Sequence, residues 1–235
     1  MGGRGSSSNK GNNSGTSQIT DSEYGLLESS KYGDHLTSAS GDKEAISFGE
    51  KIGMNKNEIN LIHSYTGELY HALNSDIRAG KVGVTTFVKD KMNKALDKIT
   101  NHKGEVYRGL SVENTDNFIK GLKSNTKGFK FDSFTSTSTS MKQASSFLSK
   151  GKNNVIFSIK SKTGKNIQHL SQQKSESEIL FKAGTKFKFI SWICLFGSGY
   201  SNSIILYSYS ITSLPLPDCL IACSADSNVG YHFFK

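Results

Sequence analysis

The chain has 235 residues and a formal net charge of +9, which is enough length for one sizeable domain with extensions. No apolar run reaches the roughly 18 residues that a membrane-spanning helix needs, so we expect no membrane span. The basic balance suits a nucleic acid, an anionic membrane or a phosphate-bearing ligand. Because neither a block of Lys and Arg nor a nucleic-acid-binding motif accompanies it, we expect no nucleic-acid partner.

The composition divides the chain into three parts. Residues 1–43 are rich in Gly, Ser, Asn and Thr, which predicts a flexible leader without the apolar centre of a secretory signal peptide. Residues 44–206 carry the periodic patterns of a packed domain. Residues 207–235 form an atypical low-charge tail, because no charged residue occurs between Lys188 and Asp218. The cysteines, Cys194, Cys219 and Cys223, lack metal-ligand spacing, so we expect no metal site.

Helical periodicity dominates the first half of the domain. A pattern that begins at Glu44 breaks near Gly53, resumes with Asn57 as the predicted N-cap, and ends at Gly80 and Gly83. A second amphipathic helix is predicted at 87–99, with apolar residues on one side and Lys and Asp on the other.

The second half changes to short strands. We expect helices at 114–122 and 141–150, a polar loop at 161–175, and strands at 105–110, 129–131, 134–137, 154–160, 176–181, 186–190 and 203–207. The first of these strands is expected to end at Gly109. Helices first and strands afterwards favour an α+β fold over alternating βαβ units.

Three polar features lie on or beside these strands: Arg108, the run Ser136-Thr137-Ser138, and the pair Glu176 and Glu178. Residues two apart on an extended strand point to the same face, so the two carboxylates are expected side by side, roughly 6–7 Å apart. Taken singly, each feature also fits a bland role, as a surface charge, a helix cap or a solvated pair on an edge strand.

Taken in order, the three features resemble the Arg, Ser-Thr-Ser and Glu-x-Glu signature of mono-ADP-ribosyltransferases. The resemblance is greatest to the enzymatic components of clostridial binary toxins and to phage-borne enzymes of this class, and it covers residues 44–206. Further matching features are Tyr107-Arg108-Gly109, Phe134 two residues before Ser136, Phe147, Gly184-Thr185 before Phe187, and Tyr65-Thr66-Gly67 followed by Tyr70 and Asn74.

The resemblance implies an ADP-ribosyltransferase fold, in which N-terminal helices pack on two short mixed β-sheets that form a cleft for NAD as co-substrate. It implies catalytic roles for Arg108, Ser136, Glu176 and Glu178. The NAD-binding residues that it implies are Tyr107, Arg108, Gly109, Ser136, Thr137, Ser138, Phe147 and Glu178.

The chemistry of these residue types agrees with that assignment. A guanidinium such as Arg108 binds phosphate or ribose oxygens, and Gly109 lets backbone approach the ligand. Phe147 is expected either to stack on nicotinamide or, by periodicity, to lie in the helix core with Met141. A carboxylate such as Glu178 stabilises the oxocarbenium-like ribose that forms when nicotinamide leaves.

Glu176 is expected to dock the acceptor. A carboxylate holds a guanidinium in a fork and helps to remove its proton. In the family that this chain resembles, Glu at this position goes with arginine as the target, so we expect a protein partner with an exposed arginine. The polar loop Leu170 to Ser175 is expected to be flexible and to meet that partner.

Two alternatives stay open. The same site could use water as acceptor, which would make the protein an NAD glycohydrolase. The fold could also serve as an inactive basic binding or virion-associated module, because the first eight residues weakly resemble segments of phage head proteins. For an active toxin or effector we expect secretion or injection by a route without a signal peptide, with a separate translocation or virion partner as an option.

Overall fold

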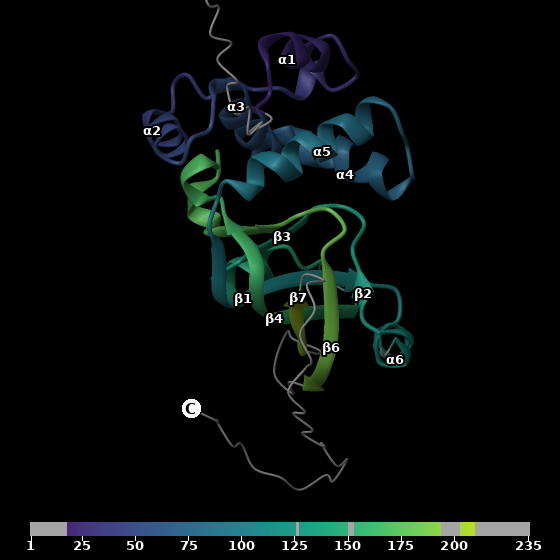
Figure 1. Ribbon diagram of the computed structural model, residues 1–235. Coiled ribbons are helices and arrows are strands. Elements are labelled where there is room, and N and C mark those ends of the chain that lie inside the picture. Colours follow the sequence, from purple (N-terminus) through teal and green to yellow (C-terminus); the bar gives the residue numbers. More distant parts are fainter. Residues whose placement is uncertain (1–17, 126, 150–152, 194–202, 210–235) are drawn as a thin grey trace, which may run out of the picture.

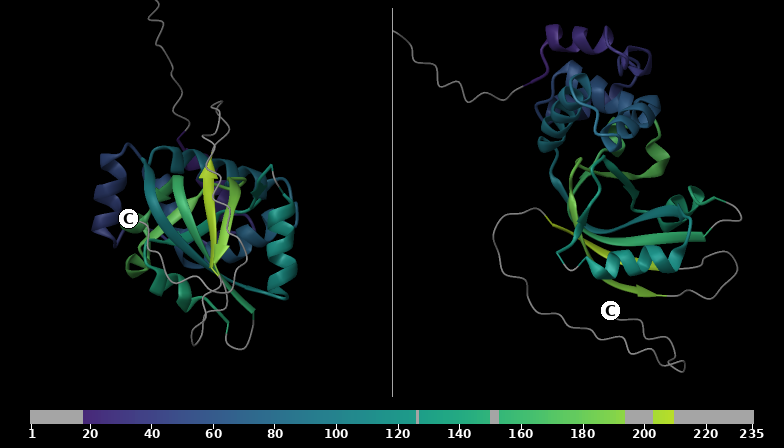
Figure 2. Two further views of the ribbon diagram at one scale, coloured as in Figure 1. Left: turned by 90° about the horizontal axis from the view of Figure 1, so that it is seen from below. Right: turned by 90° about the vertical axis from the view of Figure 1, so that its right-hand side faces the viewer.

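The computed structural model describes residues 18–125, 127–149, 153–193 and 203–209, which form two layers. Most helices gather on one side of a curved β-sheet, and the strands fill the other half of the molecule (Figure 1). Views from below and from the side show the same division, with one helix lying apart against the sheet (Figure 2). The α+β prediction is therefore confirmed.

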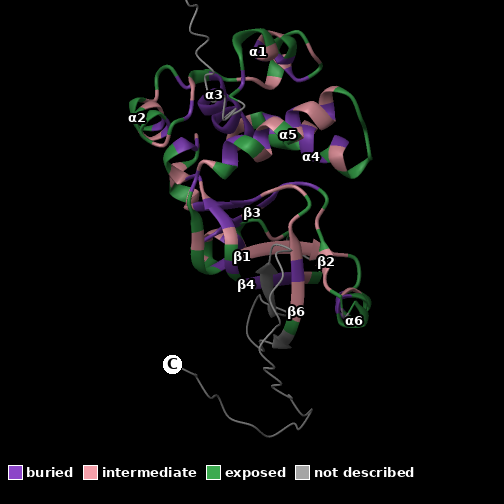
Figure 3. Ribbon diagram, viewed as in Figure 1, coloured by how far each residue is buried: buried purple, intermediate pink, exposed green. Residues whose placement is uncertain are grey.

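The helical layer is built from residues 21–97. Its elements are α1 (Asp21–Glu28), the short 3₁₀ turn η1 (Gly33–His35), α2 (Lys43–Lys51), α3 (Lys56–Ser64), α4 (Tyr70–Arg78) and α5 (Val84–Asp97). Every position of α3 from Asn57 to Ser64 is buried, so α3 forms the centre of this layer (Figure 3). The N-cap of α3 is Asn55, which exchanges hydrogen bonds with Glu58 in a capping box, so the prediction that Asn57 caps the helix was wrong.

The predicted flexible leader is wrong for residues 18–43. Helix α1 begins with a capping box between Thr20 and Glu23, and it buries Tyr24 and Leu27 against the other helices. Tyr32 is fully buried, and its hydroxyl donates to Asp76 on α4 at 2.9 Å. A few apolar anchors thus fold a segment whose average composition predicts disorder. Residues 1–17 lie outside the described part of the chain.

A kink at Gly67 separates α3 from α4 without an intervening loop. The connecting segment, Tyr65–Leu69, contains Gly67 with φ −98° and ψ −106°, which no regular helix uses. Sharp kinks of this kind have local causes, and glycine is one of them. Tyr65 therefore stands at the end of α3 and Tyr70 at the start of α4, on either side of the kink.

Seven described strands form one mixed sheet in the order β1-β3-β5-β4-β7-β6-β2. Strand β1 also pairs with β4, so β1, β3, β5 and β4 close into a ring instead of forming two separate short sheets. The β4–β7 pairing is parallel, and the other pairings are antiparallel. The strands are β1 (Asn101–Val112), β2 (Phe129–Lys130), β3 (Thr135–Ser138), β4 (Asn153–Asn166), β5 (Glu178–Phe181), β6 (Lys186–Ile193) and β7 (Ser203–Tyr209).

Two strands are longer than the sequence pattern predicted. Strand β1 continues through Gly109 to Val112, because β4 supplies a partner along its whole length. Strand β4 runs into the predicted polar loop and pairs at Lys165 and Asn166 with β5. Helix α6 (Thr115–Ser124) follows the helix predicted at 114–122, with Asn114 as its N-cap, whereas α7 (Met141–Ser146) is shorter than predicted.

The described residues form two hydrophobic cores, one on each side of β5. One core fills the helical layer and includes Leu180 of β5, and the other lies within the sheet under α6 and includes Ile179 and Phe181. Because side chains alternate along a strand, Glu178 shares the face of Leu180 and points toward the helical layer.

Among the described residues, no helix is both long and apolar enough to cross a membrane. Of the predicted tail, residues 207–209 belong to β7, and the remainder from residue 210 lies outside the described part. The three cysteines also lie outside it.

Candidate active site

Arg108 crosses from β1 to β3 at the centre of the site. Its Nη1 donates to the main-chain carbonyl of Ser136 at 2.6 Å. Its Nε atom is buried and has no hydrogen-bond partner among the described residues. Burial lowers the pKa of Arg108, although a guanidinium stays charged at any physiological pH. A buried donor without a partner is costly, so this atom is available to a ligand oxygen.

Glu178 begins β5 and pairs with Ser138 of β3 in the ladder. Its side chain is 6% exposed, and burial raises its pKa from 4.5 to about 7. The hydroxyl of Ser136 and the positive charge of Arg108 oppose this rise, whereas the negative charge of Glu176 adds to it. Carboxyl groups with pKa values this near neutrality are candidates for catalysis.

The helical layer closes the site over Glu178 with Tyr65. This tyrosine is 1% exposed, and burial together with the charge of Glu178 raises its pKa, while hydrogen bonding from Asn74 and Ser136 opposes the rise. Asn74 on α4 donates from Nδ2 to the Tyr65 hydroxyl at 2.9 Å and accepts from the Phe134 amide at 3.2 Å. Asn74 therefore joins the helical layer to the turn that leads into β3.

Arg78 is a member of the site that was missed by sequence reasoning. It lies one helical turn after Asn74 on α4, and its Nη1 is 3.5 Å from Ser133 Oγ. Burial is the main cause of the lowered pKa of Arg108, and Tyr65 acts in the opposite direction. The positive charge of Arg78 makes a smaller contribution that also lowers the pKa of Arg108. The spacing of Asn74 and Arg78, four residues apart on a predicted helix, was the available signal.

The three residues of the Ser-Thr-Ser run do different things. Ser136 faces Arg108 through its carbonyl and Glu178 through its hydroxyl. The Thr137 hydroxyl donates to the Ile179 carbonyl at 2.6 Å, and the Ser138 hydroxyl donates to the Glu176 carbonyl at 2.6 Å. The side chains of Thr137 and Ser138 thus hold β5 and the preceding turn, and their predicted contact with NAD stays a prediction.

Glu176 does not lie on a strand, so the expectation of two carboxylates side by side on an extended face was wrong. It ends a 3₁₀ turn, η4 (Lys174–Glu176), and is followed by Ser177 at φ 48° and ψ 50°. Ser177 is the one non-glycine residue with positive φ in the described backbone, and such left-handed residues concentrate at functional sites. Burial raises the pKa of the half-buried Glu176.

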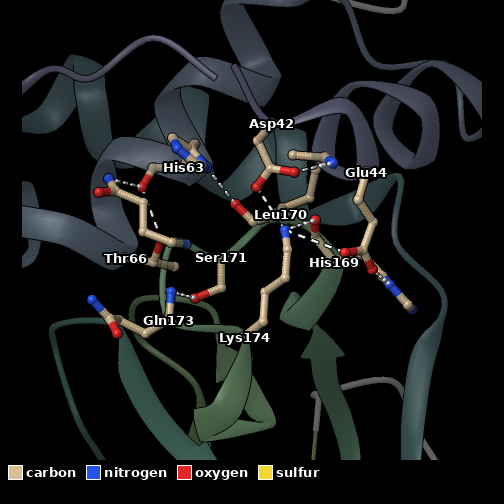
Figure 4. Close-up of polar contacts among 11 residues, drawn as sticks. Asp42, Glu44, His63, Thr66, His169, Leu170, Ser171, Gln173 and Lys174 are labelled. Atoms are coloured by element: carbon tan, nitrogen blue, oxygen red, sulfur yellow. Dashed lines mark hydrogen bonds and ion pairs between the residues drawn. The ribbon is translucent and has the colours of Figure 1, made fainter. Parts of the chain in front are cut away.

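The loop before Glu176 is anchored, which corrects the prediction of a flexible segment. Leu170 and Ser171 are fully buried, and Leu170 ends the 3₁₀ turn η3 (Gln168–Leu170). The Leu170 carbonyl lies 3.0 Å from His63 Nδ1 (Figure 4). Gln172 donates from Nε2 to the His63 carbonyl at 2.8 Å and from its amide to Thr66 Oγ1 at 3.0 Å. The absence of a Cβ at Gly67 makes room for the Gln172 side chain.

Phe147 and Tyr107 have different surroundings. Phe147 follows α7 and is 60% exposed, and Met141 is 44% exposed, so the prediction that they lie in the helix core was wrong. The exposed ring of Phe147 can stack on a ligand. Burial and hydrogen bonding with Glu105 raise the pKa of Tyr107, which alternates with Arg108 along β1. Its predicted role in NAD binding stays a prediction.

Gly109 lets α7 approach β1 closely. A Cβ at this position would lie 2.3 Å from the Ala144 carbonyl oxygen and 2.9 Å from Leu148 Cδ2. The glycine therefore permits helix packing, whereas sequence reasoning gave it contact with the ligand. The helix that it admits is the one that carries Phe147 at its C-cap.

Comparison with known proteins identifies the family. The model of the family NAD:arginine ADP-ribosyltransferase matches residues 29–213. The chain belongs to this family. It is 33% identical over 141 residues to Mav of Mycobacterium avium (strain 104), which is assigned by name to the NAD(+)–arginine ADP-ribosyltransferases. The match covers 59% of this chain and 16% of Mav, so the chain spans less than a fifth of that relative.

Solved ADP-ribosyltransferases share the fold. HopU1 of Pseudomonas syringae pv. Tomato DC3000 matches with a TM-score of 0.59 and 22% identity over 75% of this chain and 87% of its own. Vis of Vibrio splendidus, solved in complex with agmatine, matches with a TM-score of 0.55 and 21% identity over 76% of this chain and 91% of its own.

In this member of the family no group of three His, Cys, Asp or Glu residues that could hold a metal ion gathers among the described residues. The charged groups that the site does hold are two guanidinium groups and two carboxyl groups, Arg78, Arg108, Glu176 and Glu178.

Proposed function

We propose that this protein is a mono-ADP-ribosyltransferase that transfers ADP-ribose from NAD to an arginine side chain of a protein and releases nicotinamide. The observation that carries the proposal is the unequal pair of carboxyl groups. Glu178 is buried beside Ser136 and Arg108, whereas Glu176 is half-buried on an anchored turn two residues earlier.

NAD fits the charges of the site. Its diphosphate is anionic, and Arg108 offers a buried Nε that has no partner among the described residues, while Arg78 places a second guanidinium nearby. The exposed Phe147 ring offers a flat surface for the nicotinamide. The nicotinamide ring of NAD is positively charged and favours the ionised form of Glu178. NAD binding is therefore expected to lower the pKa of Glu178 from about 7.

Bond cleavage follows from the position of Glu178. When the bond between ribose C1′ and the nicotinamide nitrogen breaks, the electron pair leaves with neutral nicotinamide and positive charge develops on the ribose. The Glu178 carboxylate, oriented by the Ser136 hydroxyl, stabilises that charge. Tyr65 and the surrounding buried groups exclude water and strengthen the interaction.

Glu176 serves the acceptor. An arginine guanidinium carries no lone pair suited to attack until a proton leaves. A carboxylate accepts two of its N–H groups and removes one proton as the nitrogen bonds to C1′. The burial that raises the pKa of Glu176 also makes it a stronger base.

A role as a toxin or effector is part of this proposal. Vis, which shares the fold, is described as a toxin. In that role the chain acts on a protein outside the cell that makes it, and a separate partner delivers it. Expression inside a host cell tests the role, because the wild type should arrest growth and Glu178→Ala should not.

Transfer of labelled ADP-ribose from NAD to agmatine tests the activity. Glu178→Ala should abolish both transfer and nicotinamide release, and Glu176→Gln should abolish transfer while nicotinamide release continues. Release of nicotinamide by the wild type without label on agmatine or on polyarginine would make the protein an NAD glycohydrolase. Neither activity in a folded sample would make it a binding module.

A further inference from the structure

A charged tether joins the turn that carries Glu176 to the N-terminal end of α2. The Lys174 ammonium lies 2.6 Å from Asp42 Oδ2 and 3.5 Å from Glu44 Oε2. Glu44 in turn lies 2.7 Å from His169 Nδ1, so two residues of the loop contact the same short stretch of chain (Figure 4). These contacts span more than 120 residues of sequence.

The tether is stronger than a single exposed pair. Burial would raise the pKa of Asp42, but the Lys174 ammonium and the Ala45 amide hold it below its ordinary value. The same Asp42 caps α2 through Oδ1, which accepts from the Ala45 amide at 3.0 Å. Its carboxylate is therefore fixed by the helix before it meets Lys174.

The other end of the turn is held by β3. The Ser138 hydroxyl binds the Glu176 carbonyl at 2.6 Å, and the Thr139 amide donates to the Ser177 carbonyl at 3.3 Å. The Glu176 carboxylate has no hydrogen-bond donor within the described residues, and burial alone accounts for its raised pKa. The direction of this carboxylate thus depends on the backbone between two anchors, one of which is Lys174.

We infer that Lys174 and Asp42 are positioning residues for the acceptor step, in which they hold the turn so that Glu176 faces the incoming guanidinium. This inference rests on the proposed function, because it assigns the acceptor to Glu176. Contacts of Lys174 with NAD or with the acceptor are not required. The tether contacts the start of α2, whereas Glu178 is held by the pairing of β5 with β3, so NAD cleavage should not depend on the tether.

Two variants break the tether without removing its supports. Lys174→Met keeps the aliphatic stem of the side chain and loses the charge. Asp42→Asn keeps an oxygen that can cap α2, and it loses the negative charge that pairs with Lys174. Each variant removes only charge from a partly exposed group and leaves the buried core untouched, so both variants should fold. Lys174→Arg is the conservative variant, because it restores a cation with similar reach.

The measurement is the transfer fraction, which is labelled agmatine divided by nicotinamide released. Misplacing an orienting group costs one or two decades in rate, so Lys174→Met and Asp42→Asn should lower the rate of agmatine labelling roughly 10- to 100-fold and should thereby lower the transfer fraction. Nicotinamide release without agmatine should stay within about twofold of the wild type, and Lys174→Arg should recover most of the transfer.

Lys182→Met is the matched control. It removes an ion pair with Asp97 at 2.8 Å, which joins the end of β5 to α5 away from the turn, and it should leave the transfer fraction unchanged. If the wild type transfers label and the tether variants keep the same fraction, the inference is overturned while the proposed function stands. If the wild type transfers none, both fail. An equal loss of transfer and release would assign the tether a structural role and also overturn the inference.

Discussion

The two layers of the molecule contribute to the site in different ways. The sheet supplies Arg108, Ser136 and Glu178 from three paired strands, and their positions follow from the ladder. The helical layer supplies Tyr65 and Asn74, which surround and orient those groups. The difference indicates that changes in the sheet should remove the reaction, whereas changes in the helices should alter how well the site is held.

The largest expected effect tests the sheet side. Arg108→Lys keeps a positive charge but removes the planar group whose Nη1 binds Ser136 and whose Nε is free for NAD. We expect kcat/KM for NAD to fall by roughly 100-fold or more, as for loss of a preorganised donor. Steady-state nicotinamide release measures it. Near-normal activity of the variant would show that charge alone suffices.

The next effect is on the pH profile. Glu178 must be ionised to stabilise the ribose, and its pKa in the free protein is about 7. Below that pH, kcat/KM for NAD should fall roughly tenfold per pH unit. The midpoint of the pH profile of kcat should lie at a lower pH, because the positively charged nicotinamide ring of bound NAD favours the carboxylate form of Glu178. A profile that is flat from pH 5 to pH 8 would exclude Glu178 as the titrating group.

Stability should respond in the opposite direction to activity at the same residue. The raised pKa means that the ionised Glu178 destabilises the folded state. This penalty is absent below pH 4.5, grows between pH 4.5 and about 7, and stays constant above. Glu178→Gln should therefore be more stable than the wild type at pH 8, by up to about 3 kcal/mol, and should gain nothing at pH 4.

Urea unfolding at both pH values measures this difference. An equal gain at pH 4 and pH 8 would mean that packing, and not charge, sets the stability at this position. The activity of Glu178→Gln in the same samples should be lost at every pH. The two measurements together separate the destabilising effect of the Glu178 carboxylate from its role in catalysis.

The smallest expected effect tests the helical side. Asn74→Ala leaves the Phe134 amide without its partner and removes one of the two hydrogen bonds of the Tyr65 hydroxyl, which should cost roughly 1–3 kcal/mol of unfolding free energy. Activity should fall less than for Arg108→Lys. Asn93→Ala is the control, because Asn93 accepts from the Ala183 amide at 3.2 Å outside the site. A loss of activity as large as for Arg108→Lys would break the distinction between the layers.

Local sequence patterns predicted the elements better than their ends. Helix α5 and the strand that carries Arg108 follow from periodicity, because α5 turns its apolar residues to the core of the helical layer and β1 turns Val106 to the core within the sheet. The full length of β1 does not, since it depends on β4, which is more than 40 residues away in the chain. Likewise, the order of α1 depends on buried Tyr24 and Leu27, which average composition hides.

The site shows the same limit. The spacing of Glu176 and Glu178 suggested one extended face, but Ser177 takes a left-handed conformation that no local pattern for serine predicts. The segment before it is polar, yet His63 and Lys174 fix it through partners that only the fold brings close. Contacts between distant segments therefore decide which polar loop is mobile and which is anchored.

The left-handed Ser177 has a consequence for how such proteins diversify. Glu176 lies before it and outside the strand ladder, whereas Glu178 lies after it and inside the ladder. Replacements of side chains in the turn Lys174–Glu176, none of which is buried, therefore need not shift the register of β5. In the proposed function, acceptor docking by Glu176 and NAD cleavage by Glu178 then have separate supports. A change of acceptor would need a new turn with its anchors, while the paired strand that carries Glu178 stays as it is.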